Sequence, residues 1–486
     1  MKRLFCPILV LLLLAACSPK ARDAVACGER PDIYPDYVGV TVPVTIAPLD
    51  FTLKGADAID VLLSAPDGTE LRSAGKTSTR FSEKRWRKIL QRSAGDSLRV
   101  LVSGRIDGQW KIFAPFCLFV STDAIDYGLT YRLLEPGYEI YSKMGIYERE
   151  LSSFRQSALL ENTQFDGCLN CHASQQGDPG TWTLHIRGSH GATLLQHKGK
   201  MAAYNTKTDS TLGFCVYPYW HPSGRYIAYS TNNTRQGFHV QPDKIIEVFD
   251  LDSDIQVYDV EKNELITAPQ VKRPGIWETF PVFSPDGGTL YFTAAKQVEI
   301  PGELPQSRYN LMKVSFDPET GRIGDDVEMV VDAASQSKSL CFPRPSYDGK
   351  YLMYTLCDYG TFSIWHHESD LWLLDLETLE SRPLDGVNSA DTDSFHNWSS
   401  NSRWFVFSSR RDDGLFTRLY IAHFDDNGVA GKPFMLPQRD PKNYYENFFF
   451  SYNVPEFVTG PVPLNRIRAQ KAINAPERIP FGYRSK

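Results

Sequence analysis

The residues from 168 to 172 read Cys-Leu-Asn-Cys-His, which is a Cys-x-x-Cys-His motif. On a helical turn, two thiols three residues apart lie on one side of the backbone. They can then add to the two vinyl groups of a haem, and the adjacent histidine can serve as an axial ligand of the iron. We therefore expect Cys168, Cys171 and His172 to hold one covalent haem c.

The second axial ligand is sought among the histidines that follow the motif. A histidine in a flexible turn flanked by glycine can swing onto iron, which makes His190 the first choice and His185 the second. Arg187 lies between them, and its guanidinium suits a haem propionate because arginine and carboxylate form a bidentate pair.

Two other kinds of chemistry fit the same residues. Cys168 and Cys171 alone can form a redox-active disulfide, which has no need of His172. A structural zinc ion needs four ligands, and the two thiols could supply them together with one or two histidines. The histidine candidates for that zinc site are His172, His185 and His190.

The first residues of the chain have the features of an export signal. Lys2 and Arg3 precede an apolar run over 4–14, which is too short to span a membrane. Small residues then lead to Cys17. We expect a signal peptide over 1–16.

Composition indicates a folded protein of mildly acidic character. The chain has 486 residues, of which 42% are hydrophobic and 13% aromatic, and its formal net charge is −6. Because no basic block is present, nucleic acid is excluded as an expected partner. The nine cysteines are too few for a disulfide scaffold.

One cysteine pair is a candidate disulfide. Cys341 and Cys357 flank Gly349 symmetrically, and a symmetric hairpin would place them face to face. Pro343 and Pro345 can break that register, so the sequence leaves the bridge open.

The N-terminal half is expected to contain three segments. Residues 17–35 are polar and read as a tether. Residues 36–125 carry strand-like runs, an Asp-Gly hairpin turn at 107–108 and one helix that begins after Ser82, which together predict a small β-sandwich-like domain. Residues 126–204 are expected to connect the domains through a short helix over 154–161 that leads into the haem motif, or else to form a degenerate first blade.

From about residue 205 the chain repeats itself. Turn residues recur at intervals of about sixty residues, which suits four-stranded blades with inserted loops. Aromatic or apolar residues follow each turn at the third and fifth positions, and a proline or histidine precedes it by six: Pro218, Pro281, Pro343 and His396. These features predict a β-propeller of about six blades over 205–460, followed by a tail over 461–486.

The turn sequences also carry a family resemblance. The segments at 220–224, 283–287 and 346–350 resemble the repeats of TolB-like β-propellers. The end of the signal resembles a bacterial lipobox, which implies that Cys17 becomes the lipidated N-terminus. Together with the Cys-x-x-Cys-His motif, the chain resembles exported TolB-like lipoproteins of the Bacteroidetes kind that carry one cytochrome c motif.

These features lead to two hypotheses about function. The first is a haem protein of the cell envelope, anchored to the membrane by its lipid. It would transfer electrons or sense redox state while the propeller docks an unidentified redox or envelope protein. The second is a non-redox scaffold whose propeller binds a protein or glycan and whose motif is a disulfide or metal clip. An enzyme has less support, because neither a nucleophile elbow nor a phosphate-binding glycine loop is present.

Overall fold

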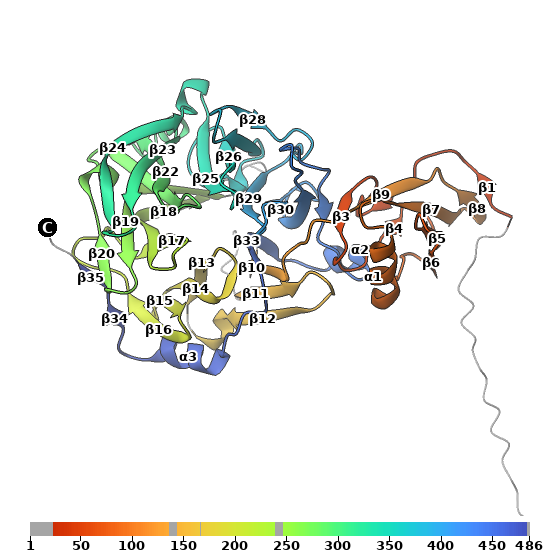
Figure 1. Ribbon diagram of the computed structural model, residues 1–486, viewed down its shortest axis with the longest axis horizontal. Coiled ribbons are helices and arrows are strands. Elements are labelled where there is room, and N and C mark those ends of the chain that lie inside the picture. Colours follow the sequence, from red (N-terminus) through yellow and green to blue (C-terminus); the bar gives the residue numbers. More distant parts are fainter. Residues whose placement is uncertain (1–22, 136–142, 166, 239–245, 484–486) are drawn as a thin grey trace, which may run out of the picture.

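The computed structural model describes residues 23–135, 143–165, 167–238 and 246–483. Most of its regular structure is β-strand, as the sequence predicts. Among the described residues, one seven-stranded sheet is followed by six sheets of four or five strands. Figure 1 shows these six sheets around a common centre, with the seven-stranded sheet at one side. This arrangement is a β-propeller-like fold. The predicted signal over 1–16 and Cys17 lie outside the described residues.

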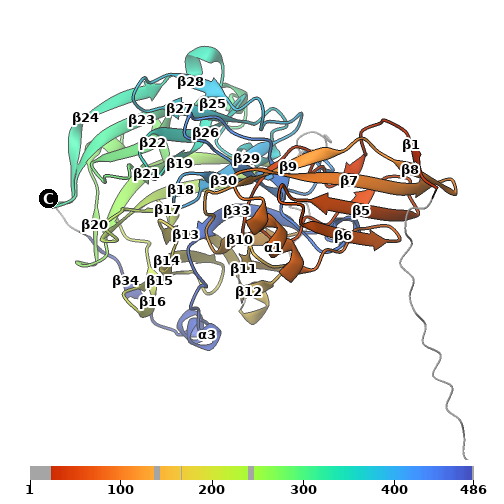
Figure 2. The same ribbon diagram turned by 45° about the vertical axis from the view of Figure 1, so that its right-hand side comes forward.

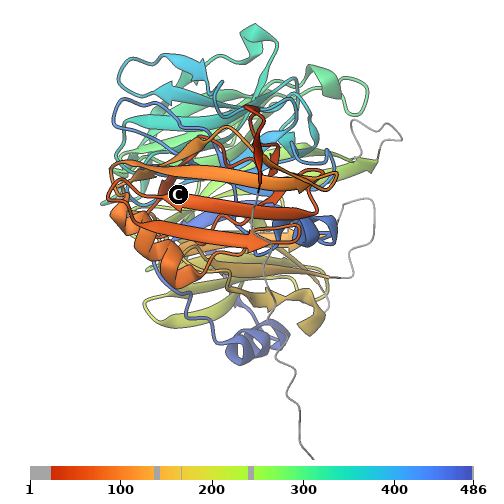
Figure 3. The same ribbon diagram turned by 90° about the vertical axis from the view of Figure 1, so that its right-hand side faces the viewer.

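The N-terminal region forms the seven-stranded sheet, which faces the viewer in Figure 3. Its strands are β1 (Val25–Ala26), β3 (Thr41–Pro43), β5 (Ala58–Ser64), β6 (Glu70–Gly75), β7 (Ser97–Ile106), β8 (Gln109–Ile112) and β9 (Phe116–Ser121). A small second sheet joins β2 (Ile33–Tyr34) to β4 (Thr52–Leu53). The predicted hairpin turn at Asp107 and Gly108 connects β7 to β8, and both turn residues have the positive φ that such a turn requires.

The predicted helix is α1 (Glu83–Arg92), and Ser82 is its N-cap residue. It buries Trp86, Ile89 and Leu90 in the same apolar cluster as the strands of the large sheet. The expected sandwich of two sheets is therefore wrong in detail. A helix and a two-stranded sheet accompany the single large sheet.

The six following sheets are built from successive stretches of chain. Their strands are, sheet by sheet, β10 (Gly128–Leu134), β11 (Met144–Glu150) and β12 (Gln156–Glu161) with β33 (Ser451–Val458); β13 (Cys168–Gln175), β14 (Asp178–Arg187), β15 (Ala192–His197) and β16 (Lys200–Asn205); β17 (Cys215–Trp220), β18 (Tyr226–Phe238), β19 (Ile246–Asp259) and β20 (Glu264–Ile266); β21 (Ile276–Phe283), β22 (Thr289–Lys296), β23 (Asn310–Asp317) and β24 (Arg322–Val331); β25 (Ser339–Pro345), β26 (Tyr351–Cys357), β27 (Asp370–Asp375) and β28 (Ser381–Pro383); β29 (Asp393–Trp398), β30 (Trp404–Ser409), β31 (Arg418–His423) and β32 (Phe434–Met435).

The innermost strands meet around the centre. Strand β13 contacts β17, and contacts of the same kind continue through β21, β25, β29 and β33 and back to β13. The innermost strand β33 comes from the C-terminal part of the chain, where it pairs antiparallel with β10. One sheet thus combines strands that are more than three hundred residues apart in the sequence.

Residues 126–204 differ most from the prediction. They do not form the connection that was expected first, because they contribute the strands β10 to β16 to two sheets, which agrees with the alternative of a degenerate blade. The predicted helix over 154–161 is the edge strand β12, and the predicted helical setting of the Cys-x-x-Cys-His motif is the strand β13. Pairing with one neighbouring strand each, β11 and β14, has overridden the local helical pattern.

The C-terminal segment is packed against the sheets. After α2 (Pro441–Glu446) and β33, the chain forms α3 (Arg466–Asn474), which buries Ala469 and Ile473. The short strands β34 (Ile479–Pro480) and β35 (Gly482–Tyr483) then add in parallel to the outer strands β16 and β20. Figure 2 shows α3 below β12 and β16.

The N-terminal sheet shares one apolar core with the propeller-like part. A single buried cluster contains Val61 and Val100 of that sheet together with Phe407 and Phe457 of the later sheets. An ion pair of 2.7 Å between Lys432 and Asp36 also crosses the contact. We expect the two parts to unfold together.

Across the described ranges, no helix is both long and apolar enough to cross a membrane.

The pairing of β33 with the rest of the propeller-like part can be tested by a matched pair of substitutions. Phe457 lies on β33 and is 2% exposed, whereas Phe449 precedes the strand and is 62% exposed. Because Phe457→Ala leaves a cavity in the common core, we expect it to lower the free energy of unfolding by about 3–5 kcal/mol. Phe449→Ala should change it by less than about 0.5 kcal/mol, as measured by denaturant titration. Equal losses in the two variants would contradict this packing.

Candidate functional site

The six innermost strands surround a cavity of about 310 Å³. Each strand presents one residue to it whose backbone has a positive φ, between 44° and 51°. We call these residues the cavity ring: Cys171, Tyr217, Phe280, Phe342, Phe395 and Val454. Residues other than glycine rarely adopt such a φ. Its occurrence at the equivalent position of six strands therefore identifies a repeated feature of the backbone.

This repeated feature is a two-residue β-bulge. At each ring residue the ladder to the neighbouring strand is interrupted, and the next residue is a proline or a histidine. Proline has no N–H to contribute to a ladder, so it is tolerated within a sheet at this kind of interruption. The bulge turns the side chain of the ring residue toward the cavity. The residue pairs are Cys171–His172, Tyr217–Pro218, Phe280–Pro281, Phe342–Pro343, Phe395–His396 and Val454–Pro455.

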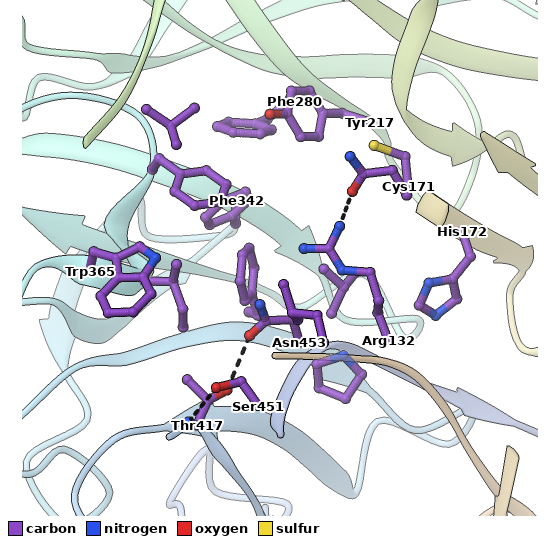
Figure 4. Close-up of a pocket in the computed structure, with 18 of the residues that line it drawn as sticks. Arg132, Cys171, His172, Tyr217, Phe280, Phe342, Trp365, Thr417, Ser451 and Asn453 are labelled. Atoms are coloured by element: carbon purple, nitrogen blue, oxygen red, sulfur yellow. Dashed lines mark hydrogen bonds between the residues drawn. The ribbon is translucent and has the colours of Figure 1, made fainter. Parts of the chain in front are cut away.

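Aromatic members of the ring are in contact with one another. The ring centroids of Tyr217 and Phe280 are 4.6 Å apart, those of Phe280 and Phe342 are 4.3 Å apart, and those of Phe342 and Phe395 are 4.8 Å apart. This spacing is that of packed aromatic pairs. One side of the cavity is therefore a continuous aromatic wall, seen in Figure 4.

Cationic side chains form another part of the cavity wall. Among the described residues, the cavity is lined by five arginines and only two carboxylates: Arg132, Arg187, Arg235, Arg344 and Arg410, with Glu135 and Glu456. In the part of the chain that the structure describes, Arg132, Arg344 and Arg410 form no ion pair within 4.0 Å. Arg132 instead donates to the side-chain amide oxygen of Asn170.

Arg410 is the most deeply buried of these cations. It is 3% exposed, and the carbon of its guanidinium lies 3.3 Å from the ring centroid of Trp365. Burial lowers the pKa of the guanidinium to about 9. Its Nε has no hydrogen-bond partner among the described residues. A buried charge without a partner is costly, so this position is suited to a ligand anion.

Glu456 is the buried carboxyl group of the cavity. It accepts hydrogen bonds from the backbone N–H and the hydroxyl of Ser174, at 2.9 and 3.3 Å. Burial nevertheless raises its pKa to about 7, and the positive charge of Arg344 opposes that rise.

The Cys-x-x-Cys-His motif lies in the cavity wall, where Cys168, Cys171 and His172 all contribute to the lining. Both thiols are half-buried and unbridged. Burial raises the pKa of Cys171. Burial also lowers the pKa of His172 to about 3, so its imidazole is neutral at ordinary pH.

The geometry of these three residues does not fit a covalent haem. Nε2 of His172 is buried and has no hydrogen-bond partner among the described residues. The ring lies beside a second, apolar cavity of about 40 Å³ between β13 and the neighbouring sheet. One water occupies roughly 30 Å³ in the liquid, so that space is far too small for a macrocycle, and His172 shares only the larger cavity with the two thiols. In Figure 4 the sulfur of Cys171 points toward Tyr217, whereas the imidazole of His172 points away from it.

The other predicted haem residues lie apart from His172. His185 is 2% exposed and hydrogen-bonds through Nδ1 to Thr193 at 3.1 Å. Its neighbours in β14, Leu184 and Ile186, pack into the cluster on one face of the sheet, so His185 faces the other. It contacts Phe214 on that face. His190 lies in the turn between β14 and β15.

Neither His185 nor His190 is among the described residues that line the cavity, whereas Arg187 is. The zinc alternative also gains no support. Within the described ranges, no group of three or more His, Cys, Asp or Glu side chains is placed to hold a metal ion.

Cys341 and Cys357 are buried neighbours. Their sulfur atoms are 3.8 Å apart, and both thiols are free. The bulge after Cys341 shifts the register, so Cys341 faces Thr355 and Cys357 faces Ser339. The symmetric pairing that the sequence suggests is therefore absent, although the two side chains still meet diagonally.

The cavity ring and the unpaired arginines were not predicted from the sequence. The ring residues of four sheets stand one position before the repeated proline or histidine that the sequence alignment contains. That regular position is the signal that could have identified them. Arg410 and Trp365 carry no such signal, because they lie on loops of different length.

Comparison with known proteins gives no family. No protein-family model matches the chain, and no curated protein does. Three solved structures of low similarity are prolyl endopeptidases (12% identity, 63% of this chain and 42% of that chain, TM-score 0.34), a DUF4784 family protein from Bacteroides caccae (9%, 72% and 94%, 0.30) and a puromycin-hydrolyzing peptidase of Mycobacterium tuberculosis (12%, 62% and 46%, 0.34). The chain thus spans less than half the length of two of these three.

The pKa of Glu456 leads to a test of stability against pH. Because its pKa is near 7 in the folded protein and near that of a free carboxyl group in the unfolded chain, the folded state binds the proton more tightly. The contribution of Glu456 to stability is therefore fully present below about pH 4.3 and is lost as the pH rises to about 7.

Glu456→Gln keeps a neutral side chain at every pH, so we expect it to remove this part of the decline in unfolding free energy between pH 4.5 and 7. The control is Glu319→Gln, at an exposed position. An unchanged slope in the Glu456→Gln protein would contradict the raised pKa.

Proposed function

We propose that this protein is a cell-envelope binding protein in which a closed, six-bladed propeller holds a small anionic ligand in its central cavity. The observation that carries the proposal is the excess of cavity arginines over carboxylates, with three guanidinium groups unpaired among the described residues. The continuous contacts of the innermost strands and the pairing of β33 with β10 support a closed ring.

Arginine is suited to this role because its planar guanidinium stays charged and can donate two parallel hydrogen bonds to a carboxylate or phosphate. Arg410 and Arg344 also contact aromatic rings, which hold the cations in place. Beside them, the aromatic wall can contact an apolar part of the ligand. Recognition of an anion with a small apolar body follows from this combination.

This proposal replaces haem-based electron transfer as the preferred function and retains the binding scaffold that was the second hypothesis from the sequence. It also retains export and the lipid anchor at Cys17, which depend on the sequence of residues 1–17. Docking of an envelope protein or glycan on the propeller is compatible with a ligand in the cavity and stays a prediction.

Ligand binding can be measured by calorimetric titration of the full chain with inorganic phosphate, sulfate and a panel of small mono- and dicarboxylates. We expect one of these anions to bind. Arg410→Met should weaken it by roughly tenfold to a hundredfold, because a hydrogen bond to a charged group contributes about 1.5–3 kcal/mol.

Arg322→Met is the matched control, because Arg322 is exposed and pairs with Asp325 away from the cavity. Arg410→Met removes a buried, unpaired charge, so without ligand the variant should be as stable as the wild type or more stable. Failure of every anion to bind the wild type, or equal affinity in the Arg410→Met protein, would contradict the proposal.

The anchor is tested separately. If Cys17 is lipidated, the wild-type protein should partition with membranes, and Cys17→Ala should shift it to the soluble envelope fraction. Immunoblotting of the two fractions measures this shift. Retention of the variant in the membrane fraction would show that something other than a lipid on Cys17 holds the protein there.

A further inference from the structure

The residues Cys171 and His172 have counterparts in every other sheet around the cavity. Cys171 has a φ of 44°, and the five other cavity-ring residues have φ between 47° and 51°. In β13 the ladder to β14 is interrupted between Asn170 and Ala173, so that only residues 171 and 172 are left out of it. The interruption in β29 leaves out Phe395 and His396 in the same way.

The imidazoles of His172 and His396 also lie against equivalent strands of the preceding sheets. Nε2 of His396 hydrogen-bonds to the backbone oxygen of Met353 at 3.0 Å, on β26, the second strand of the preceding sheet. The imidazole of His172 lies beside the backbone of Thr130, on β10, which is the second strand of its own preceding sheet, but its Nε2 has no hydrogen-bond partner among the described residues.

The two backbone neighbours are equivalent in register. Met353 faces Arg344, the first paired residue after the bulge in β25. Thr130 faces Glu456, the first paired residue after the bulge in β33. His172 and His396 thus lie at equivalent places between neighbouring sheets, and His396 forms a hydrogen bond there. Both imidazoles are neutral for the same reason, because burial lowers the pKa of each to about 3.

We infer that the Cys-x-x-Cys-His sequence of this chain is the propeller's own repeated bulge rather than a haem-attachment site. Cys171 is the cavity-ring residue of its sheet. His172 is the second residue of the bulge and is buried against the preceding sheet. Cys168 lies three residues earlier, where the other innermost strands and their approaches carry unrelated residues such as Phe214, Trp277 and Thr392. The motif therefore arises because the bulge pair of this sheet, Cys171 and His172, follows an unrelated cysteine, Cys168.

The haem question is decided on the unaltered protein. The full chain is expressed with its own signal in a host that attaches haem covalently, and the purified protein is assayed as its pyridine haemochrome. We expect no covalent haem. A stoichiometric haem band that survives denaturation would overturn the inference, whatever the variants below do.

The role of His172 is tested by exchange with the residue that four other sheets carry. His172→Pro is compared with the matched variant His396→Pro by thermal unfolding. Each variant gains a residue that suits the bulge, and His396→Pro loses one hydrogen bond between sheets, so we expect both midpoints to stay within about 4 °C of the wild type. A large loss in His172→Pro alone would show that His172 has a role that His396 lacks.

A second substitution is independent of the hydrogen bond. Cys171→Phe installs the residue found at three other ring positions, and we expect it to fold with a midpoint close to that of the wild type because the bulge already directs this side chain into the cavity. Collapse of this variant would contradict the equivalence of the six positions.

Discussion

The repeated bulge in the innermost strands is the constraint on which the site depends. A continuous strand would alternate its side chains between the two faces of a sheet, and both faces are covered by neighbouring sheets. The two-residue interruption changes that alternation at one position and turns a side chain toward the common centre. Six such positions make a wall from residues that are about fifty to sixty positions apart in the chain. The strain of a positive φ at each is sustained by the pairing on either side.

The electrostatic character of the cavity follows from the absence of acidic residues from the cavity ring. Aromatic and apolar ring residues offer no counter-charges, and three of the arginines that reach the same space, Arg132, Arg344 and Arg410, form no ion pair among the described residues. Arg410 illustrates the balance, because burial lowers its pKa while contact with Trp365 stabilises the cation. Burial has the opposite consequence for the charge of the cavity at Glu456, because it favours the neutral form of that carboxyl group. The site is thereby suited to an anion and unsuited to a second cation.

The sequence was informative where the structure is local and repetitive. The alternating aromatic residues after each turn, the helix after Ser82 and the hairpin at Asp107–Gly108 depend on neighbours a few residues away, and these predictions are confirmed. The pairing of β33 with β10 could not be read in this way, because no local pattern specifies a partner more than three hundred residues distant. Residues 126–204 were expected to form a connection or a degenerate first blade, because only the later repeats share one clear turn pattern; Gly177 does turn β13 into β14. The unpaired arginines are also a product of tertiary packing, since nothing in their local sequence separates them from arginines such as Arg322 on the surface.

The interpretation of Cys-x-x-Cys-His shows how a motif depends on the element that carries it. Three residues of separation place two side chains on one side of a helix, and on a regular strand the same separation places them on opposite faces. In β13 the bulge lies within the motif, so both cysteines reach the cavity wall although the segment is a strand. The histidine, however, is buried between two sheets beside Thr130. A haem-attachment site requires the thiols and the imidazole to act on one macrocycle, and here the sulfur of Cys171 and the imidazole of His172 point in different directions, as Figure 4 shows. The sequence therefore has the spacing of a haem-attachment motif. That spacing acts in haem attachment when the motif lies on a helical turn, and at this position the chain forms the strand β13 instead.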